Sequence, residues 1–196
     1  MRRPFMSTPE QLAGLDGQQY LVLRPAGPVA RSYRTIQEDA LARIDAPLRH
    51  PHTEHVTLRG FAEPERRDEL RALIVEWAAQ QEPLELVAEA VDGFPSPWQI
   101  LIIRLARTPA LVGAYASLSR ALEPTTFRRL DELSVEEWTF HLSLLYGKTL
   151  DAAAWRRLTA REYRPLVPEP AEVVHEAEFV WYDEGVEHAE ILPLGH

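Results

Sequence analysis

The chain has 196 residues, of which 45% are hydrophobic and 26% charged, the composition of a globular protein with a substantial core. It contains no cysteine, which excludes disulfide bonds, thiolate metal sites and cysteine nucleophiles. The net charge of −9 argues against extended DNA binding, because proteins that grip long nucleic acids carry a basic face, and it favours a small phosphate ester held by a few local cations.

The N-terminal region has two basic residues but no apolar segment of the kind found in secretory signals. No run of apolar residues in the chain is long enough to cross a membrane. We therefore expect a cytoplasmic protein with no membrane partner. It should form a single domain over residues 1–196, in which residues 1–16 are loose.

Strands and helices are predicted to alternate through the first half of the chain. Tyr20–Leu23 is typical of a strand, and the proline- and glycine-rich Arg24–Pro28 ends it. Apolar residues at helical spacing predict a helix over about Thr35–Ala46, before two prolines. His55–Phe61 is predicted as the next strand, and Pro64 suits the first turn of an amphipathic helix that follows it.

The second half repeats this alternation. The expected elements are strands at Leu84–Val91 and Trp98–Leu105, a helix from Leu111 to Leu122, a strand at Trp138–Gly147, a helix from Asp151, and a closing hairpin of Val173–Tyr182 and Glu187–Leu192. This order favours an α+β fold with two antiparallel-rich sheets and peripheral helices.

Two short segments match each other closely. His55–Leu58 and His141–Leu144 each read His, apolar, hydroxyl, apolar, and the two histidines are 86 residues apart. On a strand, alternate side chains share a face, so each segment presents an imidazole and a hydroxyl over a buried apolar face. Two such matches arise by chance on the order of once in a hundred chains of this composition. A lone match is more simply a half-exposed strand histidine, but the pair indicates a symmetric site with two proton-transfer groups.

The chain resembles the 2H phosphoesterase superfamily, which is defined by two His-x-Thr/Ser motifs on strands that face a common cleft. His55–Phe61 is similar to its first motif, and Phe140–Gly147 is similar to the second motif of plant and yeast cyclic phosphodiesterases. The resemblance extends from about Tyr20 to the C-terminus. It implies the two-lobed fold of the 2′–5′ RNA ligase (LigT-like) proteins, in which a pseudo-two-fold axis relates two lobes around a central cleft.

The resemblance also implies roles for four residues. His55 and His141 would be the catalytic acid and base, and Thr57 and Ser143 would bind the phosphate oxygens. An imidazole titrates at about pH 6.5, so either histidine suits either role, and the sequence does not say which is the base. The resemblance implies that no metal or other cofactor is required.

Two further residues are weaker candidates for substrate binding. Arg59 shares the predicted strand face of His55 and Thr57, and a guanidinium can bind phosphate, although most strand arginines are simply solvated or ion-paired. Tyr146 lies where the cyclic phosphodiesterases carry a substrate-contacting tyrosine. Strict alternation turns it away from His141, so only a bulge or a strand end would bring it to the cleft.

Other aromatic and histidine residues have competing explanations. Phe94 and Trp98 flank a proline-rich loop and suit base stacking, but packing is the more common role of such residues. His50, His52 and His55 are clustered enough to suggest zinc or copper, but Pro51 and the lack of a helical pair argue against a preformed metal site.

The function predicted from these features is a metal-independent cyclic phosphodiesterase. Its expected partner is a small nucleotide cyclic phosphate, namely a nucleoside 2′,3′-cyclic phosphate or ADP-ribose 1″,2″-cyclic phosphate. A first alternative is an enzyme that processes RNA ends, similar to the 2′–5′ RNA ligases, with an RNA terminus as partner. A second is a nucleotide-binding module without turnover. Neither the natural substrate nor the oligomeric state follows from the sequence.

Overall fold

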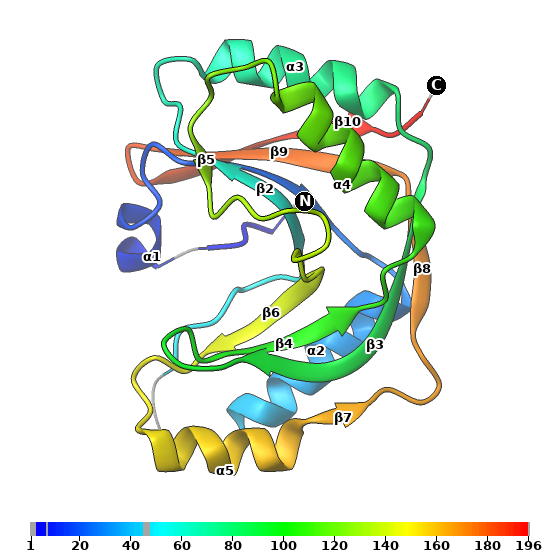
Figure 1. Cartoon of the computed structure of the whole chain (residues 1–196). Helices are drawn as coiled ribbons and strands as arrows, with labels where there is room; N and C mark the ends of the chain where they lie inside the picture. The colour runs from blue at the N-terminus through cyan, green and yellow to red at the C-terminus, as the bar shows by residue number, and fades with distance from the viewer. Residues whose placement is uncertain (1–2, 7, 45–47, 196) are drawn as a thin grey trace.

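The computed structural model describes residues 3–6, 8–44 and 48–195, and its strands form two antiparallel sheets (Figure 1). The strands are β1 (Gln19–Leu23), β2 (Val56–Phe61), β3 (Leu84–Phe94), β4 (Ile100–Leu105), β5 (Arg129–Leu130), β6 (His141–Tyr146), β7 (Arg164–Pro165), β8 (Ala171–Val174), β9 (Glu176–Asp183) and β10 (Val186–Pro193). The first sheet has the order β10-β9-β1-β2-β5, and the second has the order β6-β4-β3-β7 with β8 also paired to β3. The predicted α+β fold with two antiparallel sheets is confirmed.

Helices cover the outer surfaces of the two sheets. They are α1 (Pro9–Ala13), α2 (Pro28–Leu41), α3 (Arg67–Ala79), α4 (Pro109–Leu122) and α5 (Ala152–Glu162). In Figure 1, α3 lies above the first sheet, α4 runs from beside α3 down toward β3 of the second sheet, and α2 and α5 lie below the second sheet. Within the described ranges, no helix is both long enough and apolar enough to cross a membrane.

One hydrophobic core joins the two sheets. It contains fully buried residues of the first sheet, such as Leu21 and Leu58, and of the second, such as Leu101 and Leu144. Both motif strands contribute their apolar positions to this core. Their alternate positions therefore face away from it, toward the space between the sheets.

Helix α2 begins earlier than the predicted start at Thr35. Pro28 occupies its first turn, where the missing N–H costs no hydrogen bond. The carboxylate of Glu172 accepts hydrogen bonds from the backbone nitrogens of Gly27 at 2.9 Å and Val29 at 2.8 Å, and so caps this end. A cap from a residue so distant in sequence leaves no local signal. The predicted end of the helix, at Ala46, lies outside the described residues.

The C-terminal segment also differs from the prediction. Val173–Tyr182 was expected to be one strand, but the chain leaves the second sheet after Val174 and enters the first at Glu176. The expectation of one continuous strand is therefore wrong. The break at His175 lets a single segment pair with β3 through β8 and with β1 through β9.

The N-terminal region is packed rather than loose in the parts that the structure describes, 3–6 and 8–16. Phe5 is 2% exposed and joins a small cluster with Val22, Val180 and Tyr182. Helix α1 begins with a capping box, in which the Thr8 side chain accepts from the backbone nitrogen of Gln11. The expectation of a loose segment missed the contacts of Phe5, because these join the segment to distant parts of the chain.

Candidate active site

The two predicted motifs lie on β2 and β6, which approach each other between the sheets. In the first motif, Val56 and Leu58 are fully buried, whereas His55 and Thr57 are half-buried. In the second, the apolar positions 142 and 144 are fully buried, whereas the positions of His141 and Ser143 are half-buried. Each motif strand therefore has the two faces that alternation predicts.

Both histidines are oriented by the same local contact. The Nδ1 atom of His55 lies 3.2 Å from the carbonyl oxygen of Thr53, and Nδ1 of His141 lies 2.8 Å from the carbonyl oxygen of Thr139. Because a carbonyl oxygen only accepts hydrogen bonds, the Nδ1 atoms must carry the protons. The neutral rings then have Nε2 as a free acceptor, the form that a general base requires.

Burial disfavours the protonated form of both imidazoles, because that form is charged. The pKa of His55 is lowered to about 4, mainly by burial and also by the charges of Arg24 and His141, whereas the Thr53 carbonyl and Glu187 act in the opposite direction. Burial likewise lowers the pKa of His141, against the effect of the Thr139 carbonyl. The neutral form of both rings is therefore favoured more than in an exposed histidine.

A β-bulge in each motif strand changes the direction of the residues that follow. In β2, Thr57 is paired with Val22 and Arg59 with Leu21, so Leu58 is an extra residue. In β6, Ser143 is paired with Ile102 and the residue at 145 with Leu101, which makes the residue at 144 extra. Alternation is therefore broken after the hydroxyl residue of each motif.

The bulge in β2 corrects the expectation for Arg59. Its guanidinium is 1% exposed on the face away from the cleft, where it donates to Ser119 Oγ at 2.8 Å and stacks over the ring of Tyr115 at 4.5 Å. Glu132 lies 3.8 Å away. The prediction that Arg59 shares a face with His55 and Thr57 is wrong, because a bulge reverses the face of every later residue.

The bulge in β6 has the opposite consequence for Tyr146. It turns this side chain to the cleft, where burial raises the pKa of its hydroxyl and a hydrogen bond with Ser143 partly offsets that effect. The backbone nitrogen of Tyr146 donates to the carbonyl oxygen of Arg49 at 2.8 Å, which fixes the end of the strand. Tyr146 thus lies beside the motif serine.

The free edge of β6 is closed by two side chains of α2. Tyr33 donates its hydroxyl proton to the carbonyl oxygen of Ser143 at 3.0 Å, and Gln37 Nε2 lies 2.8 Å from the carbonyl oxygen of Leu144. These are carbonyls of the bulged segment, which the neighbouring strand leaves unpaired. The contacts hold the second motif in its bulged form.

A cavity of about 150 Å³ lies between the two motif strands. Its lining comprises Phe5, Met6, Leu15, Tyr20, Val22, His55, Thr57, Ser143, Tyr146, Val180 and Tyr182. His141 stands outside this lining, with its ring edge-on to Phe94 at a centroid distance of 5.0 Å. The cavity therefore brings together three of the four predicted motif residues, with the fourth on the same strand as Ser143.

The sequence profile of the 2′-5′ RNA ligase superfamily matches residues 25–186, which is most of the chain. The chain belongs to the 2′-5′ RNA ligase superfamily. A search of curated proteins gives no match.

Solved structures agree with this assignment at the level of the fold. The chain is similar to TT0787 of Thermus thermophilus, with a TM-score of 0.67 and 16% identity over 90% of this chain and 97% of that one. It is similar to E. coli LigT in complex with 3′-AMP, with a TM-score of 0.55 and 14% identity over 92% and 100%. Kluyveromyces marxianus Usb1 gives a TM-score of 0.54 and 13% identity over 91% and 99%. The chain thus has a LigT-like fold.

The contacts that place Phe5 in the cavity beside His55 are not indicated by any pattern in the sequence. The ring of Phe5 lies 4.4 Å from that of His55, and the carboxylate of Glu187 accepts from the backbone nitrogens of Phe5 at 2.9 Å and Met6 at 3.0 Å. The guanidinium of Arg24 stacks over the Phe5 ring, 4.0 Å from its centre. Only the fold brings the N-terminal segment to the motif histidine, so no spacing rule reveals it.

The clustered histidines that suggested a metal are engaged separately. Nδ1 of His50 faces the carbonyl oxygen of Pro51 at 3.0 Å, whereas Nδ1 of His55 faces that of Thr53. Among the residues that the structure describes, no three histidine, aspartate or glutamate side chains are grouped so as to hold a metal ion.

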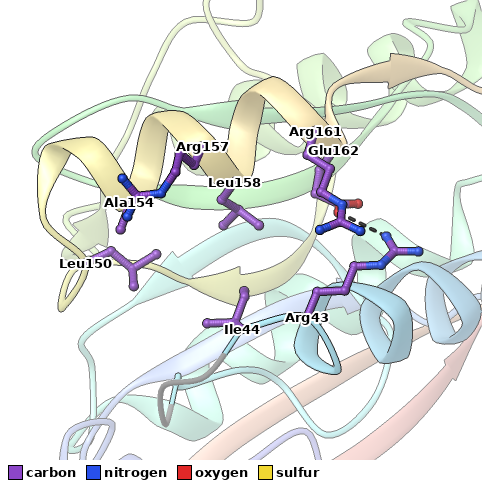
Figure 2. Close-up of a pocket in the computed structure, with 8 residues that line it drawn as sticks. All are labelled: Arg43, Ile44, Leu150, Ala154, Arg157, Leu158, Arg161 and Glu162. Carbon is purple, nitrogen blue, oxygen red and sulfur yellow. Dashed lines mark hydrogen bonds and ion pairs between the residues drawn. The ribbon is translucent and has the colours of Figure 1, made fainter.

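A second groove, of about 280 Å³, lies between α5 and the residues that directly follow α2 (Figure 2). Arg157 and Arg161 of α5 line it, and Glu162 pairs with Arg43 across it at 3.1 Å. None of the motif residues lines this groove. The arginines of α5 are therefore not part of the candidate active site.

Proposed function

We propose that this protein is a cyclic phosphodiesterase that hydrolyses a nucleotide cyclic phosphate to a monoester. The observation that carries the proposal is the matched pair of imidazoles, His55 and His141, each held by a backbone carbonyl at Nδ1 so that Nε2 is available. Ring opening by water needs one base and one acid, and two histidines supply both without a metal.

The proposed reaction is a single displacement at phosphorus. One histidine takes a proton from water at Nε2 as the water oxygen forms a bond to phosphorus. The bond from phosphorus to one ring oxygen breaks, and the other histidine donates its Nε2 proton to that oxygen. The product is a phosphate monoester beside a free hydroxyl group. Exchange with solvent then restores the two protonation states.

The hydroxyl side chains are proposed to bind the phosphate. Thr57 and Ser143 line the cavity beside the histidine, and Tyr146 lies within hydrogen-bonding reach of Ser143. Hydroxyl donors directed at the non-bridging oxygens stabilise the charge that increases in the transition state. The negative charge of the substrate also raises the pKa of both histidines, which gives the acid its proton.

The test is phosphorus NMR of the purified protein with adenosine 2′,3′-cyclic phosphate and with ADP-ribose 1″,2″-cyclic phosphate, in the presence of EDTA. We expect conversion to a monoester that EDTA does not stop. Removing one general acid or base typically costs 10²–10⁴-fold in rate, so His55→Ala and His141→Ala should each lose roughly that factor. His175→Ala is the matched control, because His175 is exposed outside the cleft. A folded His55→Ala or His141→Ala variant with near wild-type turnover contradicts the proposal.

An RNA end is the second candidate substrate. The observation that favours it is a pair of cations, Arg49 and Lys148, on a cavity that adjoins the motif residues. Phosphate contacts make RNA binding dependent on salt, so this candidate predicts a KM that rises steeply with ionic strength. Nucleotide binding without any product in the NMR experiment instead supports a binding module.

A further inference from the structure

The cavity between the motif strands is too small for a whole nucleotide. Its volume is about 150 Å³, whereas sites that enclose a small molecule usually measure roughly 300–1,000 Å³. It therefore has room for the reacting phosphate and part of the attached sugar. The remainder of any nucleotide substrate must extend out of it.

A larger cavity, of about 470 Å³, continues from the first. The two share Met6, Leu15 and Tyr146 as lining residues, so they meet at the mouth of the cleft. The larger one lies between α1 and the segment that follows β6, the side on which Figure 1 shows α1 standing over the loop toward α5. A substrate that enters this cavity reaches the motif residues past Tyr146.

Two cations of this larger cavity are held close to Tyr146. Arg49 forms an isolated β-bridge with Tyr146. Lys148 follows Tyr146 by two residues, so the Cα atoms of Tyr146 and Lys148 are at most roughly 7 Å apart. The ammonium group of Lys148 lies 5.4 Å from the centre of the exposed ring of Trp98. Both cations are therefore next to the reaction site without being part of it.

Within the part of the chain that the structure describes, no carboxylate neutralises these two cations. Neither Arg49 nor Lys148 forms a salt bridge with any carboxylate among the described residues, whereas most arginines of the two sheets and of α2 do. One carboxylate, that of Glu10, also lines the cavity, and its side chain is exposed at the rim. The cavity is thus locally positive in a chain whose net charge is −9.

We propose that this larger cavity is a second phosphate subsite, in which Arg49 and Lys148 bind a phosphate of the substrate other than the one that reacts. The inference rests on the proposed function and narrows its substrate class. The preferred substrate carries at least one phosphate group besides the cyclic phosphate that reacts, and a simple nucleoside cyclic phosphate is a poorer one. The second phosphate is supplied either by the diester of an RNA end or by the diphosphate of an ADP-ribose derivative.

The experiment compares three substrates on the full-length protein. Adenosine 2′,3′-cyclic phosphate has no second phosphate, a diadenosine dinucleotide ending in a 2′,3′-cyclic phosphate has a diester, and ADP-ribose 1″,2″-cyclic phosphate has a diphosphate. The kcat/KM of each is measured for wild type, for Arg49→Met with Lys148→Met, and for Arg31→Met with Arg120→Met. The last variant removes the same charge from exposed positions outside the cavity.

We expect wild type to have a higher kcat/KM for a substrate with a further phosphate group than for adenosine 2′,3′-cyclic phosphate. The Arg49/Lys148 variant should lose about tenfold of this preference, because charge-assisted contacts to that further phosphate are removed. The Arg31/Arg120 control should keep the preference. A loss confined to the dinucleotide identifies an RNA end, and a loss confined to the ADP-ribose derivative identifies a nucleotide sugar.

Three results would overturn the inference while leaving the proposed function intact. They are a wild type with no preference for substrates that carry a further phosphate group, an Arg49/Lys148 variant that retains the wild-type preference, and an equal loss of preference in the Arg31/Arg120 control. Failure of wild type to hydrolyse any of the three substrates is a different result, and it removes the proposed function together with the inference.

Discussion

Leu58 in β2 and Leu144 in β6 are equivalent residues of the two motifs, and each is the extra residue of a β-bulge. Each directly follows the hydroxyl residue of its motif, Thr57 or Ser143, and each is fully buried in the shared core. A bulge keeps the apolar residue in the core while it redirects the rest of the strand. The two motif strands therefore share a β-bulge as well as a sequence motif.

The two bulges lead to different walls of the cleft. After Leu144 the redirected residue is Tyr146, whereas after Leu58 it is Gly60. A Cβ atom at Gly60 would lie 3.0 Å from Cε1 of Tyr20, so the absence of a side chain there lets Tyr20 of β1 occupy the space. The first sheet thus presents Tyr20 and Tyr182 to the cavity, whereas the second presents Tyr146 from the motif strand itself. This difference makes the site asymmetric despite the matched histidines.

Replacing Tyr146 tests the consequence of the second bulge. The raised pKa of this tyrosine keeps its hydroxyl protonated at neutral pH, so it can donate to Ser143 or to a phosphate oxygen. A neutral hydrogen bond is worth about 0.5–1.5 kcal/mol, so Tyr146→Phe should lower kcat/KM by roughly three- to tenfold. Tyr163→Phe, which alters a tyrosine outside the cavity lining, is the control. Unchanged kinetics in Tyr146→Phe would remove the hydroxyl from the proposed site.

For Arg59, the structure predicts no contact with the substrate, contrary to the prediction from the sequence. Because its guanidinium is buried against Tyr115 and Ser119, Arg59→Met should keep kcat/KM within about twofold. The free energy of unfolding should change by less than about 2 kcal/mol, since replacing a buried charge with an apolar side chain of similar volume is often neutral. Kinetics and denaturant unfolding of the same preparation measure both. A loss of activity near a hundredfold with unchanged stability would place Arg59 at the substrate after all.

Sequence periodicity predicted the parts of the site that depend on alternation within one strand. His55 and Thr57, and likewise the residues of the second motif, lie as a period of two requires. The bulges were not predictable, because a bulge is defined by the register of a strand with its partner, and that register depends on the fold. The same reason explains why strict alternation predicts the wrong face for both Arg59 and Tyr146.

Long-range contacts account for the remaining differences from the sequence prediction. Phe5 reaches His55 only because Glu187, near the other end of the chain, binds its backbone. The N-terminus of α2 is likewise capped by Glu172. Neither contact has a local pattern of turns, spacing or periodicity from which it could be read.

The pH dependence of activity follows from the lowered pKa of both histidines. The proposed reaction needs one neutral and one protonated imidazole, and burial favours the neutral form of both in the free protein. The productive form therefore increases as the pH falls. Since kcat/KM reports the free enzyme, we expect it to rise between pH 8 and pH 6, by up to about tenfold per pH unit. A profile with its maximum at or above pH 7.5 would contradict the lowered values.

The stability of the protein should depend on the same protonation. His55 takes up a proton near its ordinary pKa of about 6.5 when unfolded but only near about 4 when folded. Between these values the unfolded state binds more protons, so the free energy of unfolding falls as the pH is lowered, by at most about 1.4 kcal/mol per pH unit. His55→Gln should flatten this slope in urea titrations at pH 6.5, 5.5 and 4.5. The same slope in wild type and variant would show that His55 does not carry it.

Phe5 offers a test of the cause of the lowered pKa. Its ring covers that of His55, so Phe5→Ala lets water reach the imidazole and reduces the desolvation that opposes protonation. The pKa of His55 should therefore rise from about 4 toward 6.5, and the rise of kcat/KM on acidification should begin at a higher pH. NMR titration of the imidazole Cε1 protons, assigned with His55→Gln and His141→Gln, measures the shift directly. Phe94→Ala is the matched control, because Phe94 contacts His141 rather than His55, and it should move the pKa of His141 alone. An unchanged His55 titration in Phe5→Ala would mean that the two sheets, and not the N-terminal segment, shield the two motif histidines from water.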